Sequence, residues 1–442
     1  MHRGPITFGT DGVRGTANGG LLPEDALRLG FAAARLFGGP VLVGRDTRLS
    51  GGMLSHALAA GAASGGARVI DAGILPTPGI AALAPRLGAA AAGVVSASHN
   101  PYQDNGIKFF SGEGRKLEAG DERGIESLTG ETYLERPTGG GVGTVERLDD
   151  AAGLYVGGIL ARLRPSVGGI KVLLDCANGA AYEAAPMAFG ELGADLTVVG
   201  DEPDGTNINE GCGSTHVQSL DASGHDVAFA FDGDADRVLA RDEKGDVVDG
   251  DRIIAILARD LAERGTLAGG VVVTVMTNLG FFKAMEDLSI PYEVTPVGDR
   301  HVADAMRRSD ASLGGEQSGH VILSEHVTTG DGIVTALALL DVMVRTGEPL
   351  SELARVMEVY PQELINVAVL DAASAKTLAA SEAVERAVLR AQERLGRQGR
   401  ILLRPSGTEP VVRVMVEHAD EVTCREVCKE VAGVVAEAGV RV

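Results

Sequence analysis

Residues 171–178 read Lys-Val-Leu-Leu-Asp-Cys-Ala-Asn, and this stretch shows the pattern that decides the fold. An apolar run, Val172-Leu173-Leu174, ends abruptly in a polar turn. A short, continuous apolar run of this kind predicts a strand whose sheet is covered by helices on both faces. The pattern recurs twice, as Val41-Leu42-Val43 before Gly44-Arg45-Asp46 and as Val271-Val272-Val273 before Thr274 to Asn278.

Helical patterns lie between these strands, for example from Pro23 to Leu36 and from Asp251 to Glu263. Aromatic residues make up only 4% of the chain and Trp is absent, so the core must be built from Ala, Val, Leu and Ile. Gly accounts for 61 of 442 residues, about twice its ordinary share, which indicates many tight turns. Strands that alternate with helices predict an α/β fold.

A loose internal repeat accompanies the three strands. After each strand we expect a second strand that opens into a polar loop, and these loops contain Ser98, Asp232 and Glu316. Any α/β protein can show similar offsets, so spacing alone leaves the repeat undecided. Three similar units of about 100 residues nevertheless agree with the usual size of a domain.

The chain is expected to form four domains. Gly139-Gly140-Gly141 marks a break rich in turns, a helix begins near Gly250, and a third unit ends after Tyr360-Pro361. The residues after this point show the pattern of a helix, a strand, a loop, a strand and a helix. This order predicts a small α+β domain. The expected limits are 1–150, 151–250, 251–365 and 366–442.

The charge balance excludes several classes of partner. The formal net charge is −21, and no run is rich in Lys or Arg, which argues against nucleic acid and against an anionic membrane surface. No apolar stretch reaches about 18 residues, and the N-terminal residues lack the apolar core of a signal peptide. The sequence therefore predicts a protein of the cytoplasm.

Four cysteines in a chain of 442 residues do not suggest a disulfide framework, which agrees with a reducing compartment. Cys424 and Cys428 are four residues apart on an expected helix. Because no second Cys/His pair lies nearby, we interpret them as half-buried thiols rather than as zinc ligands.

The sharpest motif is Asp232-Gly233-Asp234-Ala235-Asp236-Arg237, which follows an apolar run. Three carboxylates at alternate positions repel one another unless a cation lies between them, and hard oxygen ligands suit Mg²⁺. Asp232, Asp234, Asp236 and Glu243 also match EF-hand spacing, but Arg237 stands where that loop needs Gly. The remaining alternative is a solvated acidic turn without an ion.

The loop from Ser96 to Pro101 contains Ser98 and His99, and Lys108 follows it. A Ser directly beside a His is not a hydrolase triad, because nucleophile and base normally come from separate elements. Ser98 could carry a phosphoryl group or ligate the metal, and Lys108 could act as acid/base or hold a phosphate. The alternative is an ordinary polar turn before Pro101.

Three further loops offer polar groups for a ligand. Glu316, Ser318 and their glycine neighbours suit sugar hydroxyl groups, although such turns are common. Arg404 to Pro410 supplies a guanidinium, hydroxyls and backbone N–H groups around Gly407, as a phosphate-binding nest does. Phe8 to Gly15 adds glycines that permit close backbone approach.

Taken in order, these loops resemble the signature motifs of the α-D-phosphohexomutase family, over nearly the whole chain. Ser96 and His301 stand where the family more often has Thr and Tyr, and neither change removes a reactive group. Within the family, Phe8 to Gly15, Gly298-Asp299-Arg300 and Gln317 most resemble the members that act on glucosamine phosphates.

The resemblance implies four domains around one central cleft, three similar α/β domains followed by a small α+β domain. It implies an isomerase that interconverts glucosamine 6-phosphate and glucosamine 1-phosphate, a step toward UDP-N-acetylglucosamine and cell-wall precursors. The reaction would pass through a phosphoserine enzyme and a bisphosphorylated sugar, with hexosamine 1,6-bisphosphate as primer. A homodimer through the first domain is also implied.

The resemblance also assigns roles to individual residues. Ser98 would carry the phosphoryl group and, with the three aspartates, hold one Mg²⁺ per chain. Lys108, assisted by His99, would serve as acid/base, and Arg237 would stabilise the transferring phosphoryl group. The expected substrate-binding residues are Arg14, Glu316, Ser318, His320, Arg404, Ser406, Gly407 and Thr408.

Alternatives remain at this point. A phosphomannomutase or phosphoglucomutase of the same family would share these motifs. A metal-dependent sugar phosphatase could use Asp232 as nucleophile, but the loop lacks D-x-D-x-T, and that chemistry leaves Ser98 and Arg404 unexplained. A non-catalytic sugar-phosphate sensor would not need the reactive residues that are present.

Overall fold

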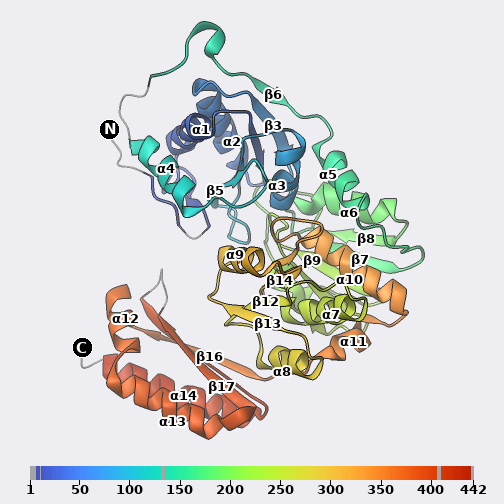
Figure 1. Cartoon of the computed structure of the whole chain (residues 1–442), viewed down its shortest axis with the longest axis vertical. Helices are drawn as coiled ribbons and strands as arrows, with labels where there is room; N and C mark the ends of the chain where they lie inside the picture. Colours follow the sequence, from blue (N-terminus) through green and yellow to red (C-terminus); the bar gives the residue numbers. More distant parts are fainter. Residues whose placement is uncertain (1–5, 10, 131–134, 406–409, 440–442) are drawn as a thin grey trace. The chain divides into compact units, whose positions relative to one another are not determined.

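The protein was analysed as a computed structural model, which describes residues 6–9, 11–130, 135–405 and 410–439. The chain divides into two compact units. The first contains Met1–Met276 and Leu288–Val356, and the second contains Thr277–Asp287 and Met357–Val442. Three sheets belong to the first unit and one to the second (Figure 1).

The first sheet has six strands in the order β1-β5-β4-β2-β3-β6. Strands β2, β3, β4 and β6 run parallel, whereas β5 is antiparallel to both β1 and β4. The strands are Val13–Thr16 (β1), Val41–Arg45 (β2), Val69–Ile74 (β3), Ala91–Val95 (β4), Asp104–Ser111 (β5) and Val145–Arg147 (β6).

The second and third sheets have five and four strands, in the orders β11-β10-β9-β7-β8 and β13-β12-β14-β15. The second is built from Lys171–Asp175 (β7), Asp195–Val199 (β8), Val227–Phe231 (β9), Val238–Asp242 (β10) and Val247–Val248 (β11). The third is built from Val271–Thr274 (β12), Tyr292–Thr295 (β13), Leu313–Gly315 (β14) and Val321–Leu323 (β15).

All three sheets share one topology. In each, the first parallel strand (β2, β7 or β12) lies between two parallel neighbours, and the third strand turns back as an antiparallel fourth. The turns β4–β5, β9–β10 and β14–β15 are therefore equivalent, and they contain Ser98, Asp232 and Glu316 respectively. The repeat expected from the sequence is real, although the loop follows the third strand of each unit rather than the second.

Helices cover both faces of the first sheet, which explains its continuous apolar strands. Val41 and Val43 pack in one cluster with residues of α1 (Pro23–Phe37) and α2 (Gly51–Ser64). Gly44 faces the opposite side, where a Cβ would lie 2.2 Å from Ile80 of α3 (Thr77–Arg86). Alternate residues of one strand thus contribute to two cores.

The remaining helices of the first unit follow the same layered plan. They are Ala119–Gly130 (α4), Ala151–Leu160 (α5), Ala181–Glu191 (α6), Gly250–Glu263 (α7), Asp299–Ser309 (α9), Gly332–Thr346 (α10) and Leu350–Leu353 (α11). Among the described residues, no helix is long and apolar enough to cross a membrane.

The second unit is a three-stranded antiparallel sheet with helices. The sheet has the order β16-β18-β17, with the bounds Gln362–Ala368 (β16), Gly399–Pro405 (β17) and Val411–His418 (β18). Its helices are Leu279–Asp287 (α8), Ala372–Ala379 (α12), Glu382–Leu395 (α13) and Glu421–Gly439 (α14). The expected small α+β domain is confirmed, and so are three α/β units before it.

Helix α8 joins this unit through the buried Glu417, which accepts a 2.9 Å hydrogen bond from the Leu279 N–H and pairs with Arg400 at 2.7 Å. The expected domain limits remain a proposal. The two compact units change at residues 276/277, 287/288 and 356/357. Cys424 and Cys428 are fully rather than half buried. Their Sγ atoms face carbonyl oxygens of β18.

Candidate active site

Ser98 lies at the start of the β4–β5 turn with a positive φ of 51°, unusual for a residue with a Cβ. Its Oγ donates a 2.5 Å hydrogen bond to Oδ2 of Asp232 and lies 3.3 Å from Nδ1 of His99. The Ser98 residue is buried. Two loops that are far apart in sequence therefore meet at the predicted phosphoryl-carrying hydroxyl.

Asp232, Asp234 and Asp236 lie in the β9–β10 turn and are all buried. One carboxylate oxygen of each lies within 4.8 Å of the others. Oδ1 of Asp234 and Oδ1 of Asp236 are buried without a hydrogen-bond partner among the described residues. Burying ionised oxygens in this way is costly unless a cation neutralises them, so the cluster fits a metal site.

The three carboxylates do not share one electrostatic environment. Burial and the charges of Asp236 and Asp234 raise the pKa of Asp232 well above its ordinary value. Burial also acts to raise the pKa of Asp236, but Lys108 and His320 hold it well below the usual range. Lys108, on β5, supplies much of this charge, because its Nζ lies 2.6 Å from Asp234 and 3.6 Å from Asp236.

Lys108 is itself held in its charged form. Burial acts to lower its pKa, but the carboxylates of Asp234, Asp11 and Asp236 raise it above the ordinary value. The Nζ atom faces the aspartate cluster. Lys108 is thus a cation of the cluster in this structure, and an ammonium is a proton donor and not a base.

His99 and Arg237 complete the surroundings of Ser98. Burial, together with the positive charges of Arg237 and Arg14, lowers the pKa of His99. The Arg237 N–H donates to Oδ1 of Asp232 at 3.2 Å, and its Nε lies 3.7 Å from Asp236. Arg14 pairs with Asp11 and lies 3.5 Å from the Asn100 amide oxygen. All three predicted residues gather around the Ser98 turn.

His320 is buried at the end of the β14–β15 turn and contacts the aspartate cluster rather than open solvent. Its Nε2 accepts a 3.1 Å hydrogen bond from the Gly330 N–H, which leaves Nδ1 to carry a proton, 3.7 Å from Oδ2 of Asp236. Burial lowers its pKa, but Asp236 and neighbouring carboxylates raise it overall. A Cβ on Gly330 would lie 2.5 Å from the imidazole, so this packing requires glycine.

The other residues of the β14–β15 turn lie nearer the surface. Glu316 is half buried and accepts a 3.0 Å hydrogen bond from the Gly298 N–H. Gln317 donates through Nε2 to Oδ2 of Asp249 at 3.3 Å, and Ser318 is exposed. The predicted sugar-binding groups thus lie on one turn but do not contact Ser98 in this structure.

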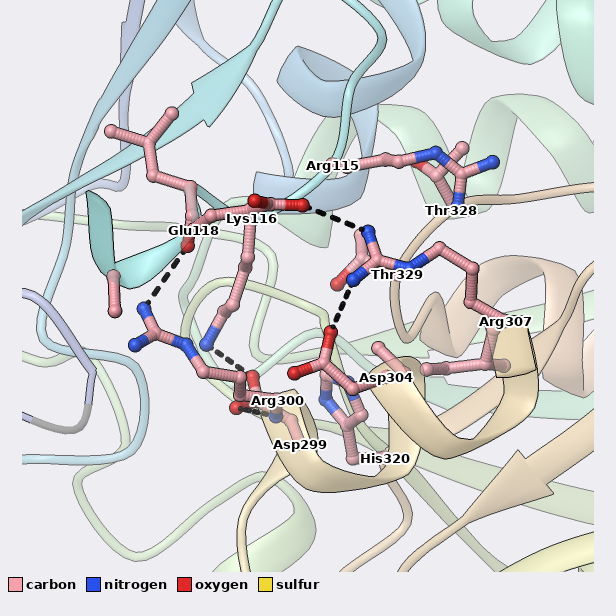
Figure 2. A pocket seen from close by; sticks show the side chains of 14 residues that line it. Arg115, Lys116, Glu118, Asp299, Arg300, Asp304, Arg307, His320, Thr328 and Thr329 are labelled. Atoms are coloured by element: carbon pink, nitrogen blue, oxygen red, sulfur yellow. Dashed lines mark hydrogen bonds and ion pairs between the residues drawn. The ribbon is translucent and has the colours of Figure 1, made fainter. Parts of the chain in front are cut away.

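A cavity of about 260 Å³ borders this region (Figure 2). Figure 2 shows Lys116 pointing toward Asp299, and Arg307 between Glu118 and Asp304, with His320 nearby. The positively charged side chains that line the cavity are paired with carboxylates. Arg14, Lys108, Arg237 and Arg300 likewise each face an acidic side chain.

The loop that was predicted to bind phosphate begins at Arg404, in the second unit. Arg404 is half buried near the end of β17, where burial and the neighbouring Arg413 lower its pKa. The expected ligands Ser406, Gly407 and Thr408 lie outside the described residues.

Comparison with known proteins identifies the family. Models of the α/β/α domains I, II and III of phosphoglucomutase/phosphomannomutase match residues 5–135, 155–245 and 249–360, and the model of the C-terminal domain matches 364–434. The phosphoglucosamine mutase of Rubrobacter xylanophilus is 72% identical to the chain and covers 98% of each sequence. The chain belongs to the phosphoglucomutase/phosphomannomutase family.

Other family members extend this result. The phosphoglucosamine mutase of Moorella thermoacetica is 52% identical, covering 93% of this chain and 95% of the relative. The solved structure of a family protein from Burkholderia thailandensis is 25% identical, with a TM-score of 0.82 and 96% coverage of both chains. An N-acetylphosphoglucosamine mutase of Aspergillus fumigatus, solved with GlcNAc-6P and magnesium, shares the fold at 20% identity and a TM-score of 0.72, covering 98% of this chain and 96% of that chain.

The resemblance inferred from the sequence motifs is confirmed, as are the fold class and the reaction class, a phosphohexomutase isomerase. Within the family, the chain groups with enzymes named phosphoglucosamine mutase. The phosphatase alternative, which left Ser98 and Arg404 unexplained, is set aside by this membership.

Several residues of this family member that fix the Ser98 turn or the aspartate loop were not predicted from the sequence. Arg48, which was not among the predicted site residues, is buried and hydrogen-bonded to the turn. Asn209 donates to the Ser98 carbonyl at 3.0 Å, and Thr77 donates to Asp234 at 2.6 Å. The polar turn after β2 was a usable signal for Arg48, but nothing local marked Asn209 or Thr77.

Proposed function

We propose that the chain interconverts glucosamine 6-phosphate and glucosamine 1-phosphate through a phosphoserine at Ser98. The observation that carries this proposal is the buried Ser98 hydroxyl, 2.5 Å from Asp232 in a cluster with unpartnered carboxylate oxygens. The names of the relatives that are 72% and 52% identical support the choice of an amino sugar.

The proposed reaction conserves the number of phosphoryl groups. The bond between Ser98 Oγ and phosphorus breaks as a bond forms to the free hydroxyl oxygen of the sugar monophosphate, whose proton passes to a basic group. The resulting 1,6-bisphosphate then turns round. The bond from its other phosphorus to the sugar oxygen breaks as a bond to Ser98 Oγ forms, and the released sugar oxygen takes up a proton. Catalysis of such a transfer depends mainly on positioning and on stabilising negative charge.

Asp232, Asp234, Asp236 and a phosphoserine oxygen at Ser98 would hold one Mg²⁺, the ion present in the related Aspergillus structure. When bound, the ion supplies positive charge that offsets the charge of the transferring phosphoryl group. The buried oxygens of Asp234 and Asp236 without partners support this assignment.

We assign proton transfer to the cationic side of the same cluster. Lys108 is the first candidate for acid/base and would act as the acid while it is charged. His99, which lies 3.3 Å from Ser98 Oγ, would support it by accepting a proton, and Arg237 would stabilise the transferring group. His320, which contacts Asp236, would orient that carboxylate in addition to any contact with substrate.

The substrate would be held at both ends, because either phosphate must be able to face Ser98. Glu316 and Ser318 are proposed to bind sugar hydroxyl groups, and Gln317 to favour the amino sugar. The phosphate that does not react would be held by Arg404, Ser406, Gly407 and Thr408, with Arg14 at the other end.

The remaining elements of the proposal concern context. Domains with the limits 1–150, 151–250, 251–365 and 366–442 would surround a cleft, and the first would form a homodimer. Hexosamine 1,6-bisphosphate would prime the enzyme. The product would feed UDP-N-acetylglucosamine and cell-wall precursor synthesis in the cytoplasm.

The test compares wild type and Ser98→Ala with glucosamine 6-phosphate and a trace of glucosamine 1,6-bisphosphate. Wild type should form glucosamine 1-phosphate, and its intact mass should include a phosphatase-sensitive species heavier by about 80 Da. Ser98→Ala should do neither. Mutase activity near wild type in that variant, or release of inorganic phosphate without isomer formation, would contradict the proposal.

A further inference from the structure

Arg48 is the largest of the fully buried side chains in the described part of the chain, with no exposed side-chain surface. It lies in the turn between β2 and α2, and its charge is balanced by Asp46, whose Oδ2 is 2.9 Å from Nε. A buried guanidinium is stable only when its charge and its N–H groups all find partners.

Every N–H group of this guanidinium has a partner. Nε donates to Asp46. Nη2 donates to the carbonyl oxygens of Ser98 and Asn100 at 2.8 and 2.7 Å, and Nη1 donates to those of Pro101 and Asp104, the latter at 3.1 Å. Five donors meet five acceptors, so Arg48 has no donor left for a substrate phosphate.

The same ion pair also fixes the other side of Ser98. The Ser98 N–H donates to Ser96 Oγ at 2.9 Å, and Ser96 Oγ donates to Oδ2 of Asp46 at 2.6 Å. Arg48 holds the Ser98 carbonyl directly. Both backbone groups of Ser98 are therefore fixed by the Asp46–Arg48 pair.

These hydrogen bonds to the Ser98 backbone matter because Ser98 has a φ of 51°, in the left-handed region. A residue with a Cβ is strained in that region, and keeps this conformation only when its surroundings impose it. In this conformation, Oγ lies 2.5 Å from Asp232.

The turn is also pressed against the aspartate loop. Asn209 Nδ2 donates to the Ser98 carbonyl at 3.0 Å, beside the donor from Arg48. A Cβ on Gly233 would lie 2.6 Å from the same oxygen, so only glycine permits this approach. A small displacement of the Ser98 backbone would consequently move Oγ relative to the Asp232 loop.

We infer that Arg48 is a positioning residue for phosphoryl transfer: it holds the Ser98 turn in the strained conformation that aims Oγ at the aspartate cluster. The inference rests on the proposed function of Ser98. According to this inference, Arg48 does not contact the substrate. Its substitution should therefore lower kcat rather than raise KM.

The test is Arg48→Lys, which keeps the charge beside Asp46 but cannot reach all four carbonyls. A displacement of about 1 Å can cost about 100-fold in rate, so we expect kcat to fall by about that factor with KM changed less than about threefold. The rate at which glucosamine 1,6-bisphosphate phosphorylates Ser98, followed by intact mass, should fall in parallel. Wild-type kcat per folded molecule in Arg48→Lys would overturn the inference.

Arg241→Lys is the matched control. Arg241 also holds backbone carbonyls, those of Gly245 at 2.9 Å and Gln218 at 3.2 Å, but in a loop without any predicted site residue. The Arg241→Lys variant should have a lower midpoint of thermal unfolding and an unchanged kcat. An equal loss of kcat in both variants would reduce Arg48 to a structural role and overturn the inference.

If Arg48→Lys does not fold, Ser96→Ala tests the inference in its place. This substitution removes only the hydroxyl that links Asp46 to the Ser98 N–H. A fall in kcat of about tenfold at unchanged KM supports the inference, and unchanged kcat overturns it. Inactive wild type, or active Ser98→Ala, would instead refute the proposed function, so the two failures are distinguishable.

Discussion

The Ser98 hydroxyl and the Asp232 carboxylate, 134 positions apart in the chain, are joined by a 2.5 Å hydrogen bond between Oγ and Oδ2. The bond links the β4–β5 turn of one sheet to the β9–β10 turn of the next. These are equivalent turns of a repeated topology, and each places its polar residues beyond the carboxyl end of a central parallel strand. A repeated local design thus produces one shared site.

Asp232→Asn should remove one carboxylate group from the cluster while nearly preserving the shape of the side chain. We expect kcat to fall at least about 100-fold, because this group both faces Ser98 and belongs to the proposed metal site. Steady-state kinetics measures this. Asp195→Asn, at an exposed position on β8, is the control and should retain wild-type kcat; a comparable loss there would mean that the assay reports stability.

Mg²⁺ should stabilise the folded protein as well as permit turnover. At a concentration 100 times its Kd, a ligand bound only by the folded state adds about 2.7 kcal/mol, which should raise the thermal midpoint by several degrees. EDTA should abolish the shift and the activity together. Asp234→Asn should lose the Mg²⁺-dependent shift, and retention of the full shift in that variant would argue against the aspartate site.

Asp331 gives the stability a distinctive pH dependence. It caps α10 through the Val334 N–H at 3.0 Å and accepts a 2.7 Å hydrogen bond from the Tyr155 hydroxyl. Burial, with a minor contribution from Asp236, raises the pKa of Asp331 to about 6, against partial compensation from these hydrogen bonds. The folded state therefore binds this proton more tightly than the unfolded state does.

The contribution of Asp331 to the unfolding free energy should therefore fall by up to about 3 kcal/mol as pH rises from about 4 to about 6. Above about pH 6 this contribution should stay constant. Asp331→Asn keeps a good helix cap and should lose this slope, so its stability relative to wild type should improve over that interval. Urea midpoints at several pH values measure the difference. Asp371→Asn, at an exposed cap of α12, should follow wild type, and parallel curves for Asp331→Asn would refute the prediction.

Gln317→Met should change the preference among sugars. The Gln317 amide is anchored to Asp249 at 3.3 Å, and Met offers no polar group to Asp249 or to a substrate amine. We expect kcat/KM for glucosamine 1-phosphate to fall at least about tenfold relative to glucose 1-phosphate. The control is Gln218→Met at an exposed position, which should leave the ratio unchanged; an unchanged ratio in Gln317→Met would exclude Gln317 as a determinant.

Much of the architecture was accessible from local patterns. Val172-Leu173-Leu174 is the centre of β7, Pro23 to Leu36 lies within α1, and the final helix and two strands of the small domain fall near their expected positions. The strands β8 and β13 were not anticipated. They have several exposed residues, so the apolar runs that revealed β2, β7 and β12 are missing from them.

The candidate site was predicted less evenly. The three aspartates and Ser98 stood out because alternating carboxylates and a Ser in a turn are local features. Lys108 was predicted as an acid/base or phosphate-binding group, which remains a proposal, but its ion pair with Asp234 was not predicted. Lys108 lies on β5 of the first sheet and Asp234 in the β9–β10 turn of the second, and no local pattern records such a pairing. His320 was expected to bind substrate, which remains a prediction, and its 3.7 Å contact with Asp236 was not predicted.

The sequence by itself determined which residue types could perform the chemistry and on which turns they stand, because strand periodicity and turn chemistry act over a few residues. Only the tertiary structure decided that Ser98 meets Asp232, that Arg48 is saturated by carbonyl oxygens, and that Lys108 neutralises Asp234. Those facts depend on burial and on pairing across more than one hundred residues or between separate turns. In the low dielectric of a buried site such pairings set both charge and position, and no local pattern records them.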